Sequence, residues 1–142
     1  MYSSPVLQSY LHDLEVAHMK DQNLITFKYG YMMAYTHPDE FLNIKDKLPP
    51  ISTVKQSLVT AIMTLYMKWE LDIQREIPGF DTNHRPIEAI NNSQTHTSVE
   101  TYMTGELQSY SEVTLENILA HFLQCSKNGI NPVKGYLNAL HS

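Results

Sequence analysis

The sequence predicts an all-α fold, a compact bundle of about six or seven helices with one long polar loop. Apolar residues recur every three or four positions in seven segments, and no segment shows a convincing strand alternation. Helix-capping residues separate these segments, and only five of the 142 residues are glycine. With 42% hydrophobic residues, a chain of this length predicts one helical domain over residues 1–142 and leaves no room for a second.

Two helices are predicted at the start of the chain. The first, over residues 4–22, begins with Ser4 as N-cap and Pro5 in the first turn. Its apolar residues follow at helical spacing: Leu7, Leu11, Leu14 and Ala17. The second covers residues 24–35, and its apolar stripe consists of Leu24, Phe27, Tyr31, Met32 and Tyr35.

A short third helix and a long fourth helix follow. Thr36 and Asp39 resemble a variant capping box that starts the third helix, and Pro49 and Pro50 end it. The fourth, over residues 52–77, has the clearest periodicity and is the expected centre of the core, with Ser52 as its cap. Its stripe runs over about six turns: Val54, Leu58, Ile62, Leu65, Trp69, Ile73 and Ile77.

A polar loop, residues 78–97, precedes the last three helices. A loop of roughly 20 residues is uncommon in a compact domain and is usually functional or disordered. Thr97 and Glu100 predict a capping box for a helix over residues 97–110. Ser111 either breaks that helix or caps the next one, which Gly129 closes. Asn131 begins a seventh, over residues 131–140.

The net charge of −5 comes from one part of the sequence. Residues 86–126 contain five glutamates and neither lysine nor arginine. An acidic surface repels phosphate, which argues against nucleic acid and anionic membranes as partners and favours a protein with a basic surface. A solvated face that only aids solubility explains the same charge. One cysteine and a start without a basic or apolar signal segment predict a cytoplasmic protein.

The sequence gives no support for a metal or another cofactor. Glu15 and His18 form one Glu-x-x-His pair, but a di-iron site in a helical bundle needs two such pairs and further carboxylates. A single cysteine cannot build a structural zinc site. His121 and Cys125 lie four residues apart on one helix face, yet Cys125 falls on the apolar stripe, where burial would silence its thiol. We therefore expect no cofactor, no metal and no nucleophilic cysteine.

The helix over residues 24–35 has aromatic and methionine side chains on nearly every side. Such a helix is either fully buried or keeps a second face for a partner, and Tyr and Met are favoured at interfaces. We predict a non-catalytic protein-binding module, an inhibitor or regulator of a partner enzyme, that also forms a homodimer. The candidate interaction residues are Tyr31, Met33, Tyr35, Phe80, His84, Arg85, Glu100, Glu106 and Glu112.

Two other function classes remain open at this point. A small enzyme could use the 84–110 segment, with His84 and Arg85 over Glu100, Glu106 and Tyr102, so that a glutamate acts as base and Arg85 holds an anionic substrate. The chain could instead be a subunit that completes a larger complex.

Two stretches, residues 23–52 and 97–111, resemble a bacterial family of all-helical proteins known as a domain of unknown function. The more specific motif is Thr-Ser-x-Glu-Thr-Tyr-x-x-Gly-Glu-Leu-x-x-Tyr, from Thr97 to Tyr110, and Arg85 and Pro86 fit the Arg-Pro that precedes it. The chain also looks similar to a small pathogen effector that inhibits ubiquitin deamidase or transglutaminase effectors. That resemblance implies a homodimer that exchanges its own interface for that of its target, and a location in the host cell cytoplasm.

Overall fold

The computed structural model describes residues 2–76 and 98–134, and within these ranges every regular element is helical, as predicted. The predicted loop over residues 78–97 and the predicted helix beyond Lys134 lie outside the described residues. In chain order the elements are α1 (Ser4–Met19), α2 (Leu24–Thr36), α3 (Pro38–Ile44), the 3-10 turn η1 (Lys45–Lys47), α4 (Thr53–Glu76), α5 (Val99–Gln108) and α6 (Glu112–Lys127).

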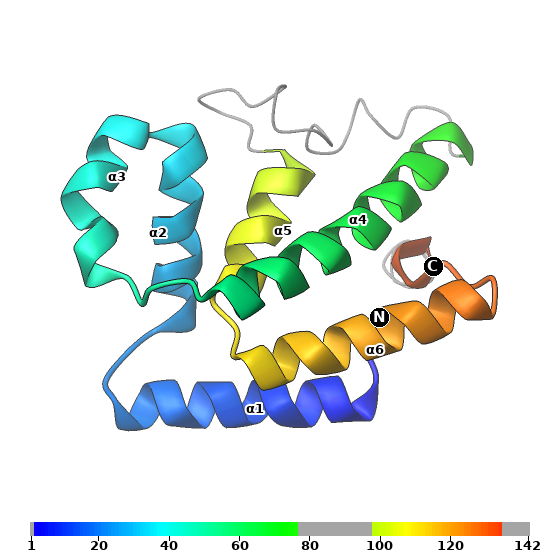
Figure 1. Ribbon diagram of the computed structural model, residues 1–142, viewed down its shortest axis with the longest axis horizontal. Helices are drawn as coiled ribbons and strands as arrows, with labels where there is room; N and C mark the ends of the chain where they lie inside the picture. Colours follow the sequence, from blue (N-terminus) through cyan, green and yellow to red (C-terminus); the bar gives the residue numbers. More distant parts are fainter. Residues whose placement is uncertain (1, 77–97, 135–142) are drawn as a thin grey trace.

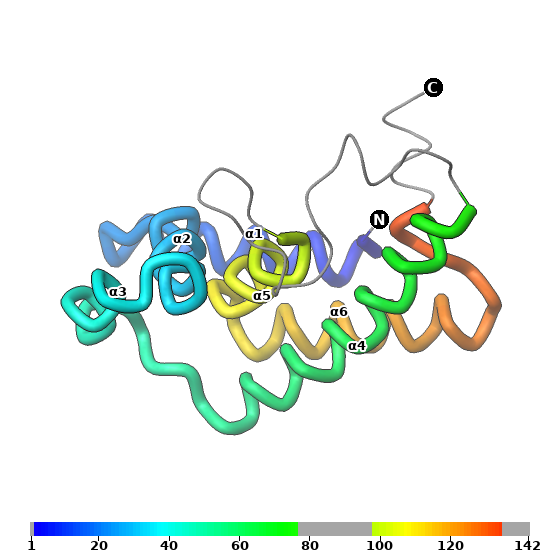
Figure 2. The backbone as a smooth tube through the Cα atoms, turned by 90° about the horizontal axis from the view of Figure 1, so that it is seen from above, coloured from blue at the N-terminus to red at the C-terminus, as the bar shows by residue number. Residues whose placement is uncertain are grey.

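The helices form two connected groups. Along the lower edge of Figure 1, α1 and α6 lie side by side and antiparallel, and α4 packs on α6. At the other end of the molecule, α2 packs between α3 and α5, and α5 joins this group to the first because it also contacts α4. Figure 2 shows the same order from above, with α3 and the last turns of α6 at opposite ends.

The core lies where α4, α5 and α6 meet. Ile62 and Ile73 of α4, Leu107 of α5 and Phe122 of α6 are completely buried. The rings of Trp69 and Phe122 meet edge to face with their centroids 5.1 Å apart, an arrangement that aromatic pairs prefer. The predicted central role of residues 52–77 is confirmed for Ile62, Trp69 and Ile73, whereas Val54 at the start of the stripe is exposed.

Side-chain caps fix several helix ends. The Oγ atoms of Ser52 and Ser111 accept hydrogen bonds from the Lys55 and Thr114 N–H groups, so both predicted caps are confirmed. Gly129 has φ +67°, and the Ile130 N–H donates to the Cys125 carbonyl across it at 2.9 Å. This is the closing turn expected of a glycine at the end of a helix.

Three predicted caps are wrong. At α1 the N-cap position is Ser3, which makes no side-chain cap, and Ser4 is the first residue of the helix. At α3, His37 rather than Thr36 occupies the N-cap position, and His37 makes no side-chain cap. Thr36 is the last residue of α2, and its hydroxyl donates to the Met32 carbonyl within that helix. At α5 the cap is Ser98, whose Oγ accepts from the Thr101 N–H, and Thr97 lies outside the described residues. At α1 and α5 two neighbouring Ser or Thr residues could each cap the helix, and spacing alone does not choose between them.

The apolar spacing that predicts α1 does not mark its buried face. Leu7, Leu11 and Leu14 are exposed, whereas Val6, Asp13 and Ala17 are buried against the rest of the molecule. The face of a helix that is buried depends on its packing partner, here α6, whose hydroxyl and main-chain groups satisfy a carboxylate. The helix also ends at Met19 rather than Gln22, because Asp21 adopts φ 54°.

Candidate functional site

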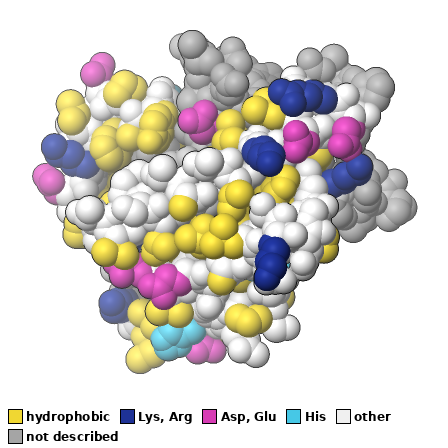
Figure 3. All heavy atoms as spheres, turned by 45° about the vertical axis from the view of Figure 1, so that its right-hand side comes forward, with side chains coloured by type: hydrophobic (Ala, Val, Ile, Leu, Met, Phe, Trp, Pro, Cys, Tyr) yellow, Lys and Arg dark blue, Asp and Glu magenta, His cyan; other side chains and the backbone are white. Residues whose placement is uncertain are grey.

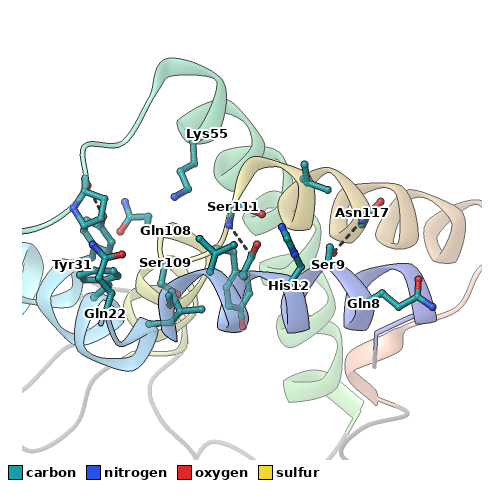
Figure 4. A pocket seen from close by; sticks show the side chains of 18 of the residues that line it. Gln8, Ser9, His12, Gln22, Tyr31, Lys55, Gln108, Ser109, Ser111 and Asn117 are labelled. Carbon is teal, nitrogen blue, oxygen red and sulfur yellow. Dashed lines mark hydrogen bonds between the residues drawn. The ribbon is translucent and has the colours of Figure 1, made fainter. Parts of the chain in front are cut away.

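A groove runs between α1, the start of α2, the first turn of α4 and the α5–α6 junction. Its volume is about 710 Å³, within the range of small-ligand sites, which is about 300–1,000 Å³. Most of its lining is apolar, and Figure 4 shows the polar side chains among the residues that surround it. The apolar lining residues include Pro5, Val16, Ala17, Leu24, Phe27, Pro49 and Val113.

A buried carboxylate ties two walls of this groove together. Asp13 of α1 is only 8% exposed, and its Oδ2 accepts hydrogen bonds from the Ser111 N–H at 3.0 Å and from the Thr114 hydroxyl at 2.7 Å. A buried carboxylate needs such donors, and charge-assisted hydrogen bonds are the strong ones. Asp13 therefore fixes α1 to the first turn of α6.

The lysine in the first turn of α4 lines the groove from the opposite side. Lys55 is half-buried, and its ammonium makes neither a hydrogen bond nor an ion pair with the described residues. Burial lowers the pKa of Lys55, although the carboxylates of Asp13 and Glu112 act in the other direction. In Figure 4 Lys55 extends from α4 toward the groove, while His12 extends from α1.

Hydroxyl groups on the groove wall are occupied by main-chain partners. The Tyr31 hydroxyl donates to the Pro49 carbonyl, and burial raises the pKa of Tyr31 to about 12. The Ser9 hydroxyl donates to carbonyls of its own helix, and the Ser109 hydroxyl donates to the Glu106 carbonyl. These three hydroxyls therefore hold the backbone.

A second, smaller cavity of about 380 Å³ lies between α2, α3 and the segment 45–51. Tyr31, Pro49 and Gln108 line both spaces, so the bond between Tyr31 and Pro49 lies where they adjoin. Tyr35 and Phe41 line only the smaller one. This arrangement places a predicted interaction residue, Tyr35, at the α2–α3 side of the molecule.

Several residues of the motif from Thr97 to Tyr110 lie where α5 crosses α2. Lys28 is buried, its ammonium lies 3.4 Å from the centre of the Tyr102 ring, and its Nζ lies 3.7 Å from Glu106 Oε1. Burial, and next the charge of the Glu106 carboxylate, raise the pKa of the Tyr110 hydroxyl. A Cβ on Gly105 would come within 2.9 Å of the Lys28 carbonyl oxygen, so the glycine lets the two helices approach. These residues therefore have a structural role.

The predicted interaction residues fall in several places. Tyr31 is buried, Met33 half-buried and Tyr35 54% exposed on α2, and Glu112 is exposed and accepts a hydrogen bond from Ser52. Glu106 faces Lys28 and Tyr110, and Glu100 is half-buried in the first turn of α5. Phe80, His84 and Arg85 lie outside the described residues, so the alternative enzyme site is described only through Glu100, Tyr102 and Glu106.

The described residues contain no cluster of His, Cys, Asp and Glu able to hold a metal. Glu15 and His18 are both exposed on α1. Cys125 Sγ lies 3.8 Å from His121 Nε2, and burial raises the pKa of the Cys125 thiol. The thiol form is therefore favoured at neutral pH, which is the opposite of what a nucleophile needs.

Sequence reasoning missed the three charged residues that organise the groove and the crossing. Lys28 is the one charged residue between Leu24 and Thr36, and its isolation in an apolar segment could have indicated burial. Asp13 shares a helix face with Val6 and Ala17, a weaker signal. The sequence does not indicate that Lys55 lines a groove, because most of the other groove residues lie in helices far from it in the sequence.

Comparisons with known proteins give a family and no activity. The sequence model of a family described as "Protein of unknown function (DUF4125)" matches residues 1–142. No curated protein and no solved structure matches the chain. Among the described residues, no helix is both long enough and apolar enough to span a membrane.

Proposed function

We propose that this chain, which belongs to the family of proteins of unknown function DUF4125, is a non-catalytic module that binds another protein. The observation that carries the proposal is the exposed side of α2. Ile25 is 63% exposed and Tyr29 51% exposed, and they lie one helical turn apart, with half-buried Met33 one turn further. We call Ile25, Tyr29 and Met33 the α2 outer face.

The composition of this face supports an interface rather than a solvated surface. Isolated exposed apolar residues are normal on soluble proteins, whereas an apolar row along a helix is less common; α1 shows a second such row with Leu7, Leu11 and Leu14. Tyr and Met are enriched in protein interfaces. The same helix already buries Tyr31 and Met32 on its inner side, so its outer residues are not needed to hold the fold together.

In this proposal the partner is an enzyme with a basic surface, which the protein inhibits or regulates. The net charge of −5 favours encounter with a basic patch. Glu112 and Glu116 lie four residues apart on the exposed side of α6 and contribute to that field. Without the partner, a second copy of the chain covers the α2 outer face and forms a homodimer. We propose the cytoplasm as its location, because a single buried thiol suits a reducing compartment.

A charge-reversal experiment tests this surface with a matched control. Tyr29→Glu places a charge on the α2 outer face, and Leu123→Glu places one on α6 at an equally exposed apolar residue. Tyr29 belongs to α2 and Leu123 to the later turns of α6, two segments that lie well apart in Figure 1. Co-purification at low salt with quantitative mass spectrometry should show partners that the wild type and Leu123→Glu retain and Tyr29→Glu loses. Identical partner sets for all three proteins would contradict the proposal.

A further inference from the structure

The groove beside α1 is separate from the α2 outer face and has its own chemistry. Its lining comes from α1, the inner side of α2, the start of α4 and the α5–α6 junction. Ile25, Tyr29 and Met33 do not contribute to it. On the face seen in Figure 3, apolar side chains form several patches with charged residues among them.

The carboxylates in and beside the groove have hydrogen-bond donors, whereas Lys55 has no ion-pair partner among the described residues. Asp13 Oδ2 already accepts from Ser111 and Thr114, and the Glu112 carboxylate at the margin accepts from the Ser52 hydroxyl at 2.7 Å. Lys55 has no ion-pair partner among the described residues, although it is half-buried and lines the groove. A partly desolvated ammonium gains most from an anion that enters the same low-dielectric space.

The apolar part of the groove adjoins this ammonium. Val16 and Ala17 of α1 and Phe27 of α2 form apolar walls, while Gln108 and His12 stand near its polar side. Ligand sites typically combine such an apolar lining with a few polar groups that fix orientation. A volume of about 710 Å³ suits a drug-sized molecule and is small for a folded partner.

We propose that this groove binds a small amphipathic organic anion, with its apolar body against α1 and α2 and its acidic group at Lys55 Nζ. Charge complementarity selects this ligand over a neutral apolar one of the same shape. Burial of the ammonium also lowers the pKa of Lys55, against the opposing effect of the Asp13 and Glu112 carboxylates, neither of which forms an ion pair with it among the described residues. The proposal is independent of the protein interface proposed for α2.

Two fluorescent probes that differ in charge provide the test. Anilinonaphthalene sulfonate has an apolar body with an anionic group, and phenylnaphthylamine has a similar body without it. Both are titrated into the folded 142-residue chain, three test variants and one control variant. Lys55→Met removes the charge and keeps the stem, Lys55→Arg keeps the charge, and Val16→Trp fills the groove from α1. Lys127→Met, at an exposed lysine on α6, is the control. Circular dichroism establishes that each variant is folded.

The expected pattern separates the charge from the apolar surface. Lys55→Met should weaken the sulfonate probe about tenfold, as expected for the loss of one charge-assisted contact, and change the neutral probe by less than about twofold. Lys55→Arg and Lys127→Met should retain both affinities, and Val16→Trp should weaken both probes. Unchanged sulfonate affinity in Lys55→Met would overturn the proposal. So would full binding of both probes to folded Val16→Trp, or displacement of both probes by self-association, which would assign the groove to a second copy.

Discussion

The Lys28 ammonium reaches Glu106 across the crossing of α2 and α5, with 3.7 Å between Nζ and Oε1, while the same ammonium lies over the ring of Tyr102. Glu106 is thereby paired with Lys28, and its charge, after burial, contributes to the raised pKa of Tyr110. The pair joins two segments whose sequences suggested partner binding or catalysis. In the structure, these contacts between the two segments pack α2 against α5.

Glu106→Gln should therefore lower the free energy of unfolding. Loss of the carboxylate leaves the buried Lys28 ammonium without its counter-charge, and the pair is partly exposed, so we expect a loss of about 1–3 kcal/mol. Urea unfolding followed by circular dichroism measures it. Glu116→Gln, at an exposed site on α6, is the control and should change stability by less than about 0.5 kcal/mol. If Glu106→Gln were as stable as the wild type, Glu106 would have no structural role at this crossing.

Gly105→Ala should be more damaging than Gly30→Ala. An added Cβ at Gly105 would lie 2.5 Å from Met32 Cγ and 2.9 Å from the Lys28 carbonyl oxygen, and the carbonyl belongs to a helix backbone that cannot easily move. At Gly30 the close atoms belong to the Leu48 side chain, the nearest at 2.8 Å. Overpacking costs typically about 1–3 kcal/mol. Thermal unfolding of both variants would show the order, and a reversed order would disprove close packing at this crossing.

Asp13→Ala should destabilise the protein by about 2 kcal/mol, because the Ser111 N–H and the Thr114 hydroxyl lose their shared acceptor at a buried site. Glu15→Ala is the matched control, a carboxylate on the same helix that is exposed. Chemical unfolding compares the two. A loss as small as that of Glu15→Ala would show that α1 is not held to α6 through Asp13.

Alkaline pH should unfold the protein cooperatively. Burial, together with nearby carboxylates, raises the pKa values of Tyr66 and Tyr110 above the ordinary value of 10.0. Because the folded-state pKa values exceed the unfolded ones, this stability is complete below pH 10 and is lost as the pH rises above it. Tyrosinate absorbance from these residues should therefore appear together with the loss of helical circular dichroism. Full tyrosine ionisation near pH 10 with the helices intact would contradict the burial of these hydroxyls.

The helices and several of their ends follow from local sequence, whereas the groove does not. Ser52, Ser111 and Gly129 act at helix ends through contacts within a few residues, so their roles are readable from spacing. The exposed position of Leu7 and the burial of Asp13 depend instead on where α6 lies, about 100 residues later.

Some features of the candidate sites could be predicted from the sequence, and others could not. The aromatic surplus of residues 24–35 predicted a second face, and α2 does expose Ile25 and Tyr29. Glu106 looked like part of an acidic docking surface, because sequence cannot show that Lys28 lies opposite it. Lys55 was missed because its neighbours in the groove come from four separate elements.

Sedimentation equilibrium of the 142-residue chain at micromolar concentrations tests the proposed α2 interface most directly. The wild type and Leu123→Glu should both behave as dimers, and Tyr29→Glu should be a folded monomer, because its charge would be buried against a second copy. A wild type that stays monomeric at high micromolar concentration, or a Tyr29→Glu variant that dimerises as tightly as the wild type, would contradict the account.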